Sequence, residues 1–129
     1  MEKEVDVALM SPLSLAYLGD ALLEIYVRER VVMSGPYRID VLHKKAVAYV
    51  NAYTQGQFYN RIEDRLTEEE VDVLKRGRNQ KKKIPRNADM NAYRKSTGVE
   101  ALFGYLYLMK REERLKELLS DFFRMVEGS

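Results

Sequence analysis

The sequence predicts an all-α protein. Apolar residues recur with a period near 3.6 residues along most of the 129-residue chain, which is the period of a helix with one buried face. Few stretches alternate with period two for long enough to form a strand. No linker is long enough to separate two domains, so residues 1–129 are expected to fold as a single domain.

The first helix is predicted over residues 12–33. Ser11 is a favourable cap and Pro12 a favourable first helical residue. The run Ser34-Gly35-Pro36 then stops the helix. Apolar positions near a 3.6-residue period are expected to face the core, namely Leu15, Leu18, Leu22, Ile25 and Val32.

A second helix is predicted to begin after a cap at Asp40 and to run to about Gln55. Gly56 follows directly, and glycine disfavours a helix interior, so Gly56 is expected to interrupt the helix. A short helix over residues 57–63 is expected after it. The predicted inward residues of the longer segment are Leu42, Ala46, Tyr49, Val50 and Tyr53.

The start of the next helix is marked by a capping box. Thr67 is followed three residues later by Glu70, and the acidic residues of this first turn suit the helix dipole. The helix is expected to end near Arg76-Gly77. Residues 78–88 contain a proline and almost no apolar side chains, which predicts a loop.

The last third of the chain is predicted to be helical again. Residues 89–110 form either one helix or a broken pair, because Gly98 could break the helix or start a new one. The final helix is expected over residues 111–127, with an inward face of Leu115, Leu118, Leu119, Phe122 and Val126.

Composition excludes several classes of protein. The chain has no cysteine, which rules out disulfides, thiol catalysis and zinc held by thiolates. No secretory signal is visible, and no apolar run approaches the roughly 20 residues that span a bilayer. We therefore expect a soluble, cytoplasmic protein with no membrane partner.

Two carboxylates stand in apolar helical runs that are far apart in the chain. Asp20 directly follows Gly19, and Glu100 lies near Gly104, so the two glycines are expected to let the helices approach closely. Two acids that meet on apolar surfaces repel each other unless a cation lies between them. The sharper hypothesis is a metal site with Asp20 and Glu100 as ligands, and Mg²⁺ suits it because it takes few protein carboxylates. The alternative is that each acid pairs with Lys or Arg on a helix surface.

Two further residues, Glu24 and His43, bear on this site. Glu24 lies one turn after Asp20 and could join the site, but it also stands four residues before Arg28, and this favourable order makes an ion pair the preferred interpretation. His43 is the only histidine, so a histidine-based metal cluster is excluded. His43 is expected to be an ordinary surface residue of a helix.

The basic charges are concentrated in residues 75–95, called the basic segment here. It holds nine basic residues and one acidic residue, a net charge of +8, whereas the whole chain carries only +2. Such a block favours a polyanionic partner over a merely solvated loop, and poor aromatic interleaving favours a duplex backbone over single strands. The predicted RNA-binding residues are Arg76, Arg78, Asn79, Lys81, Lys82, Lys83, Arg86 and Asn87.

The runs around the two carboxylates resemble the catalytic domain of the ribonuclease III family. The resemblance is carried by residues 15–23, with Gly19-Asp20-Ala21, and by residues 100–108. Supporting segments stand in matching order at residues 42–51, 76–79 and 93–98. The whole chain is similar to the small Mini-ribonuclease III family, which keeps the catalytic domain and lacks the double-stranded-RNA-binding domain.

The resemblance implies a helical ribonuclease III-like endonuclease domain that forms a two-fold dimer. It implies an endoribonuclease dependent on Mg²⁺, with Mn²⁺ able to substitute, that cuts both strands of duplex RNA and leaves 5′-phosphate and 3′-hydroxyl ends. The family's metal-binding aspartate and glutamate match Asp20 and Glu100. The likeness further suggests maturation of the ends of the large-subunit (23S) ribosomal RNA precursor, with a helper ribosomal protein as an additional partner.

The chain departs from the full-length family at three positions. Leu13, Ala16 and Thr97 stand where acidic residues are usual, which leaves the number of metal ions open. Two other hypotheses therefore remain. One is a duplex-RNA-binding module without catalysis, and the other is a helical dimerisation protein whose basic segment is only solvated.

Overall fold

The protein is described by a computed structural model that covers residues 6–81, 83–84 and 86–128. These residues form helices joined by turns and loops, and no strand occurs in the part that the structure describes, which confirms the all-α prediction. The helices are η1 (Val7–Leu9), α1 (Pro12–Met33), α2 (Ile39–Val50), α3 (Ala52–Ile62), α4 (Glu68–Arg78), α5 (Met90–Leu108) and α6 (Glu112–Glu127).

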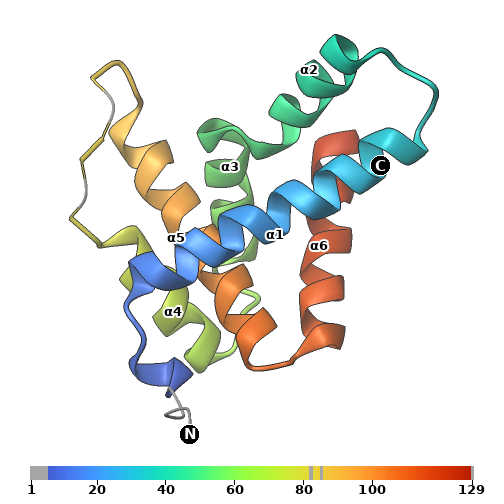
Figure 1. The fold of residues 1–129 in the computed structure, drawn as a ribbon. Coiled ribbons are helices and arrows are strands. Elements are labelled where there is room, and N and C mark those ends of the chain that lie inside the picture. The colour runs from blue at the N-terminus through green and yellow to red at the C-terminus, as the bar shows by residue number, and fades with distance from the viewer. Residues whose placement is uncertain (1–5, 82, 85, 129) are drawn as a thin grey trace, which may run out of the picture.

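Helix α5 is the centre of the fold. It packs against α1, α3, α4 and α6, and α1 crosses it in front in the view of Figure 1. Most of its residues from Ser96 to Leu106 are buried. None of the described helices is both long and apolar enough to span a membrane.

The predicted first helix is confirmed, but its inward face is partly wrong. The Ser11 side chain accepts a hydrogen bond from the Leu13 backbone N–H at 3.3 Å and caps α1. Ile25 and Val32 are exposed, whereas Val27 and Val31 are buried. Because α1 is apolar on several sides, periodicity alone could not identify the side that meets α5.

The predicted break at Gly56 is wrong, and the chain turns at Asn51 instead. The Asn51 side chain accepts a hydrogen bond from the Thr54 N–H at 2.9 Å, so it caps α3. Gly56 is buried inside α3 against Ala92. Asp40 lies in the first turn of α2 and is not its cap, and Tyr53 is exposed, not inward.

Helices α4 and α5 approach each other at a pair of glycines. A Cβ atom added to Gly77 would lie 2.8 Å from the Cα of Gly98, well inside ordinary carbon–carbon contact. Gly98 therefore serves close packing, and α5 runs through it without a break. The predicted capping box of Thr67 and Glu70 is present at the start of α4.

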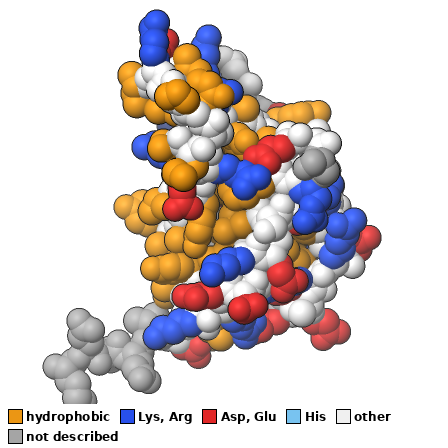
Figure 2. Space-filling model, turned by 90° about the vertical axis from the view of Figure 1, so that its right-hand side faces the viewer, with side chains coloured by type: hydrophobic (Ala, Val, Ile, Leu, Met, Phe, Trp, Pro, Cys, Tyr) orange, Lys and Arg blue, Asp and Glu red, His pale blue; other side chains and the backbone are white. Residues whose placement is uncertain are grey.

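Large apolar side chains remain exposed along α1 and α2. Figure 2 shows hydrophobic side chains gathered along one edge of the molecule, while charged side chains of both signs are spread over the rest of that face. Singly exposed apolar residues are common, but a row of them on adjacent helices favours an interaction surface. The exposed residues of these two helices are Tyr17, Ile25, Val32, Met33, Ile39 and Val47.

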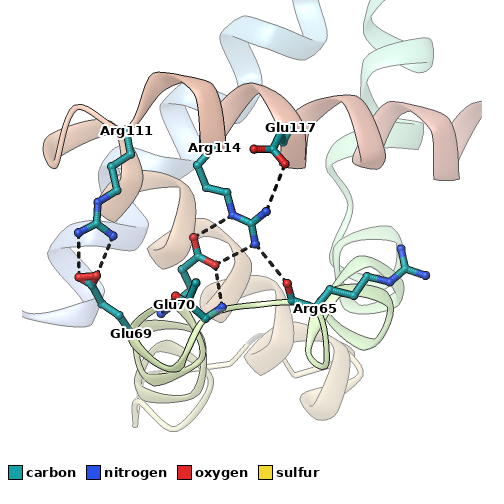
Figure 3. A network of polar contacts seen from close by, with 7 residues as sticks. Arg65, Glu69, Glu70, Arg111, Arg114 and Glu117 are labelled. Carbon is teal, nitrogen blue, oxygen red and sulfur yellow. Dashed lines mark hydrogen bonds and ion pairs between the residues drawn. The ribbon is translucent and has the colours of Figure 1, made fainter.

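A network of ion pairs fastens α4 to α6 (Figure 3). The Glu70 side chain is almost fully buried, and it accepts hydrogen bonds from Nε and Nη2 of Arg114, each at 2.9 Å. Burial acts to raise the pKa of Glu70, but the bonds from Arg114 and Thr67 outweigh it and lower the pKa. Beside it, Arg111 donates to both carboxylate oxygens of Glu69.

Candidate functional site

The structure brings Asp20 and Glu100 to one cavity. Asp20 belongs to α1 and Glu100 to α5, and the helices that carry them cross as Figure 1 shows. The cavity has a volume of about 510 Å³ and opens where α1, α3 and α5 meet. Its lining residues are Leu13, Ala16, Tyr17, Asp20, Val50, Ala52, Gln55, Tyr93, Ser96 and Glu100.

Two glycines allow this meeting of helices. A Cβ atom added to Gly19 would overlap the carbonyl oxygen of Glu100 and lie 2.6 Å from its carbonyl carbon. A Cβ atom added to Gly104 would lie 2.9 Å from the carbonyl carbon of Leu15. Since the two backbones touch, the residue after Gly19 is carried to the helix turn that bears Glu100. The predicted role of these glycines is confirmed.

The two acids differ in their surroundings. The Asp20 side chain is exposed to solvent at the mouth of the cavity, and Glu100 is partly buried. Glu100 lies within 3.4 Å of the Gln55 side-chain nitrogen, measured from Oε2 of the glutamate. The site therefore combines one accessible carboxylate with one held against the protein.

Gln55 lines the site, and the sequence alone predicts it only as the end of a helix. The available signal is its helical spacing with Phe58, Tyr59 and Ile62, and the structure buries all four residues. A polar residue at an inward position of an apolar stripe needs hydrogen-bond partners inside the protein. Such a position marks a candidate for a functional role.

The site can offer a cation two carboxylates. The described residues contain no group of three or more His, Cys, Asp or Glu side chains placed to hold a metal ion. Leu13 and Ala16 line the cavity without ligand atoms, and Thr97 is buried with its hydroxyl donating to the Tyr93 carbonyl at 3.1 Å. Carboxylate oxygens fit a hard divalent cation, and Mg²⁺ commonly keeps several waters beside one or two carboxylates.

Glu24 and His43 do not line the cavity that holds the two acids. Glu24 accepts a hydrogen bond from Arg28 Nε at 3.0 Å, as its sequence position predicted. His43 is exposed on α2, which confirms it as a surface residue. Both residues line a separate, largely apolar cavity of about 430 Å³ between α1 and α2.

The basic segment spans the end of α4, the connecting loop and the start of α5. Its first two predicted RNA-binding residues are engaged within the protein. Arg76 pairs with Asp72 at 3.1 Å, and Arg78 donates from Nη1 to the Tyr59 hydroxyl at 2.8 Å. Arg78 also donates from Nε to the Asn79 side-chain oxygen at 3.0 Å. Arg76 and Arg78 therefore help to anchor the base of the loop.

The loop itself carries exposed positive charge. Lys81, Lys83 and Arg86 are all exposed, and the Asn87 side chain lies beside them in sequence as a further exposed polar group. Lys82 lies outside the described residues. This loop leads directly into α5, the helix that bears Glu100, so the exposed positive charge and one of the two acids belong to one continuous stretch of chain.

Comparisons with known proteins agree with this arrangement. Residues 13–111 match the Ribonuclease III domain family. A Mini-ribonuclease 3 of Symbiobacterium thermophilum is 50% identical over 111 residues, covering 85% of this chain and 85% of the relative. A Mini-ribonuclease 3 of Staphylococcus aureus is 42% identical over 128 residues, covering 97% and 96%. A crystal structure of a Fusobacterium nucleatum protein aligns with a TM-score of 0.82 and 36% identity over 88% of both chains. The chain therefore belongs to the ribonuclease III family of endoribonucleases.

Proposed function

We propose that the protein is a Mg²⁺-dependent endoribonuclease that cuts double-stranded RNA, with residues 1–129 acting as one catalytic domain. The observation that carries the proposal is the meeting of Asp20 and Glu100 in one cavity. Membership of the ribonuclease III family supports the reaction type. Mn²⁺ is expected to substitute for Mg²⁺, because it accepts the same oxygen ligands.

The two carboxylates hold the divalent cation in this proposal. When bound, the cation supplies Lewis-acid chemistry that activates a water for attack on the scissile phosphorus and stabilises the leaving 3′ oxygen. Asp20 lies at the exposed mouth of the cavity, where an RNA phosphate can approach, and Glu100 lies deeper. Products with 5′-phosphate and 3′-hydroxyl ends follow from breaking the bond to the 3′ oxygen.

Affinity for the duplex is assigned to the basic segment. Lys81, Lys83 and Arg86 are exposed and offer charge to backbone phosphates, which gives affinity without base specificity. Arg76, Arg78 and Asn79 are assigned to the same surface, with Arg78 held in place by Tyr59. Lys82 and Asn87 complete the set proposed from the sequence.

We propose a two-fold dimer as the active form. The support is the row of exposed apolar residues on α1 and α2. Helix α1 also carries Asp20, so this surface and the site share a helix. A symmetric dimer would bury this surface on both copies and supply two sites, one for each RNA strand. The motif likeness extends the proposal to the ends of the 23S ribosomal RNA precursor in the cytoplasm, with a helper ribosomal protein.

The test is Mg²⁺-dependent cleavage of a long RNA duplex and of a precursor stem. We expect Asp20→Asn and Glu100→Gln to lose cleavage while keeping duplex binding. Glu24→Gln is the matched control, because Glu24 lies one turn from Asp20 on the same helix but pairs with Arg28. Equal rates for the wild type and both site variants would refute the site.

A binding module without catalysis is the second candidate, favoured by the two-acid site and by the apolar Leu13 and Ala16 in its lining. It predicts salt-sensitive duplex binding with no Mg²⁺-dependent product, so turnover by the wild type would reject it. A purely dimerising protein predicts no duplex binding at all.

A further inference from the structure

Gln55 lies in the wall of the cavity that holds the two acids. Only 2% of its surface is exposed, which is unusual for an uncharged polar side chain of this length. Its Nε2 donates to the backbone carbonyl of Val50 at 2.8 Å and to Oε2 of Glu100 at 3.4 Å. The amide nitrogen thus joins the last turn of α2 to the carboxylate of α5.

These contacts also fix the orientation of the amide. Both neighbours of Nε2 are oxygen acceptors, so exchanging the two ends of the amide would place its oxygen against two other oxygens. The opposite end is therefore Oε1. This atom is buried and has no hydrogen-bond partner among the described residues.

A buried acceptor without a donor is rare in folded proteins and costs free energy. The hydroxyl of Ser96, another residue of the wall, is already used, because it donates to the Tyr93 carbonyl at 2.7 Å. Gln55 lines the cavity, so an occupant of the cavity can supply the donor that Oε1 lacks among the described residues. Because Oε1 is buried, a donor reaches it only if the cavity wall shifts locally, and a water needs a smaller shift than a group on an RNA duplex.

We infer that Gln55 is a positioning residue for the cation site, on the basis of the proposed function. Its Nε2 holds the Glu100 carboxylate, and its Oε1 accepts a hydrogen bond from a water of the hydrated divalent cation. A cation held by only two carboxylates would keep much of its hydration shell, and those waters would supply the O–H donors. Groups that hold a ligand and its waters in this way commonly change metal affinity by about 10–100-fold.

The test is direct binding of Mn²⁺ to the full chain without RNA. Binding is measured from the loss of the electron paramagnetic resonance signal of free Mn²⁺. Gln55→Met keeps the side-chain length but removes both hydrogen-bonding ends. We expect its dissociation constant for Mn²⁺ to rise about 10-fold or more. Gln57→Met is the matched control, since Gln57 lies two residues on in α3 and is exposed. Equal affinity in the two variants would overturn the inference.

A double-mutant cycle distinguishes a positioning role of Gln55 from a purely structural role. If Gln55 acts on the cation through Glu100, Gln55→Met should weaken Mn²⁺ binding by a smaller factor in a Glu100→Gln background than in the wild type. The same factor in both backgrounds would overturn the positioning role.

A second variant keeps the inference testable if Gln55→Met fails to fold. Gln55→Glu preserves size and an acceptor oxygen, and its charge faces Glu100, so we expect severalfold tighter Mn²⁺ binding as the cation relieves the repulsion. Unchanged or weaker binding would overturn the inference.

The proposed function and this inference fail in different ways. If the wild type binds Mn²⁺ through Gln55 but cuts no duplex RNA, the nuclease proposal fails and the role of Gln55 stands. If the wild type cuts RNA while Gln55→Met and Gln57→Met bind Mn²⁺ alike, the role of Gln55 alone is refuted.

Discussion

Replacing Gly19 by alanine should damage both stability and activity through one contact. The added Cβ would overlap the Glu100 carbonyl oxygen and lie 2.6 Å from its carbonyl carbon. Because carbon atoms in ordinary contact are about 3.5–4.0 Å apart, α1 and α5 must separate locally by about 1 Å. Neither atom of this contact belongs to a flexible side chain, so the backbones themselves must move.

The size of the effect follows from two opposing terms. Overpacking a tight interior costs about 1–3 kcal/mol, and more where backbone must shift. Alanine in place of a helical glycine returns up to about 1 kcal/mol. We therefore expect Gly19→Ala to lower the free energy of unfolding by about 2 kcal/mol. Because Asp20 moves with Gly19, a shift of about 1 Å between the two acids should reduce cleavage about 100-fold.

Urea unfolding and Mg²⁺-dependent cleavage of duplex RNA measure the two effects. Gly56→Ala is the control, because Gly56 is also a buried helical glycine but its Cβ would stand 3.4 Å from Ala92, an ordinary distance. We expect this control to be as stable as the wild type or slightly more so. If Gly19→Ala were as stable and as active as Gly56→Ala, the crossing would not position the site.

Three other predictions concern charge. Glu70→Gln removes the charge that faces the Arg114 guanidinium in Figure 3, and it should lower the free energy of unfolding in urea by about 2 kcal/mol. An unchanged free energy of unfolding would contradict a stabilising role of this network. Hydrogen bonds from Arg111, and then from Tyr105, lower the pKa of Glu69 from 4.5 to about 2. The stability that this ionised group adds is full above about pH 4.5 and is lost as the pH falls through 2, so the wild type and Glu69→Gln should converge in thermal stability near pH 2. If the difference in thermal stability between the wild type and Glu69→Gln persisted unchanged near pH 2, the stabilising role of ionised Glu69 would be refuted. Lys81→Glu combined with Lys83→Glu should weaken duplex binding and reduce the slope of log affinity against log salt by about 2, and an unchanged slope would remove both lysines from the RNA surface.

The helices that the sequence predicted well are those with chemical signals at their ends. Ser11 with Pro12 marked the start of α1, and Thr67 with Glu70 marked α4. The predicted break at Gly56 is wrong because capping by Asn51 outweighs the low helix propensity of glycine. Tertiary packing against α5 keeps that glycine inside α3, while Asn51 supplies the cap that ends one helix and starts the next.

The site was predictable in part for a similar reason. Asp20 and Glu100 are recognisable as a candidate pair because charged residues are rare on apolar helical faces, and the glycines near them indicate a close crossing. Gln55 could not be assigned in the same way. Its significance depends on an amide oxygen left without a partner beside Glu100, and that is a property of three-dimensional packing.

Because α5 is unbroken, it fixes the distance between the end of the basic loop and Glu100. Glu100 stands ten residues after Met90, where the loop of the basic segment ends, and helical rise makes that about 15 Å. Each residue inserted between them would rotate the start of the helix by about 100° as well as lengthen it. Insertions in the loop would leave this spacing unchanged. Changes in the loop can therefore alter the surface offered to a phosphate backbone without changing the distance from the start of α5 to Glu100.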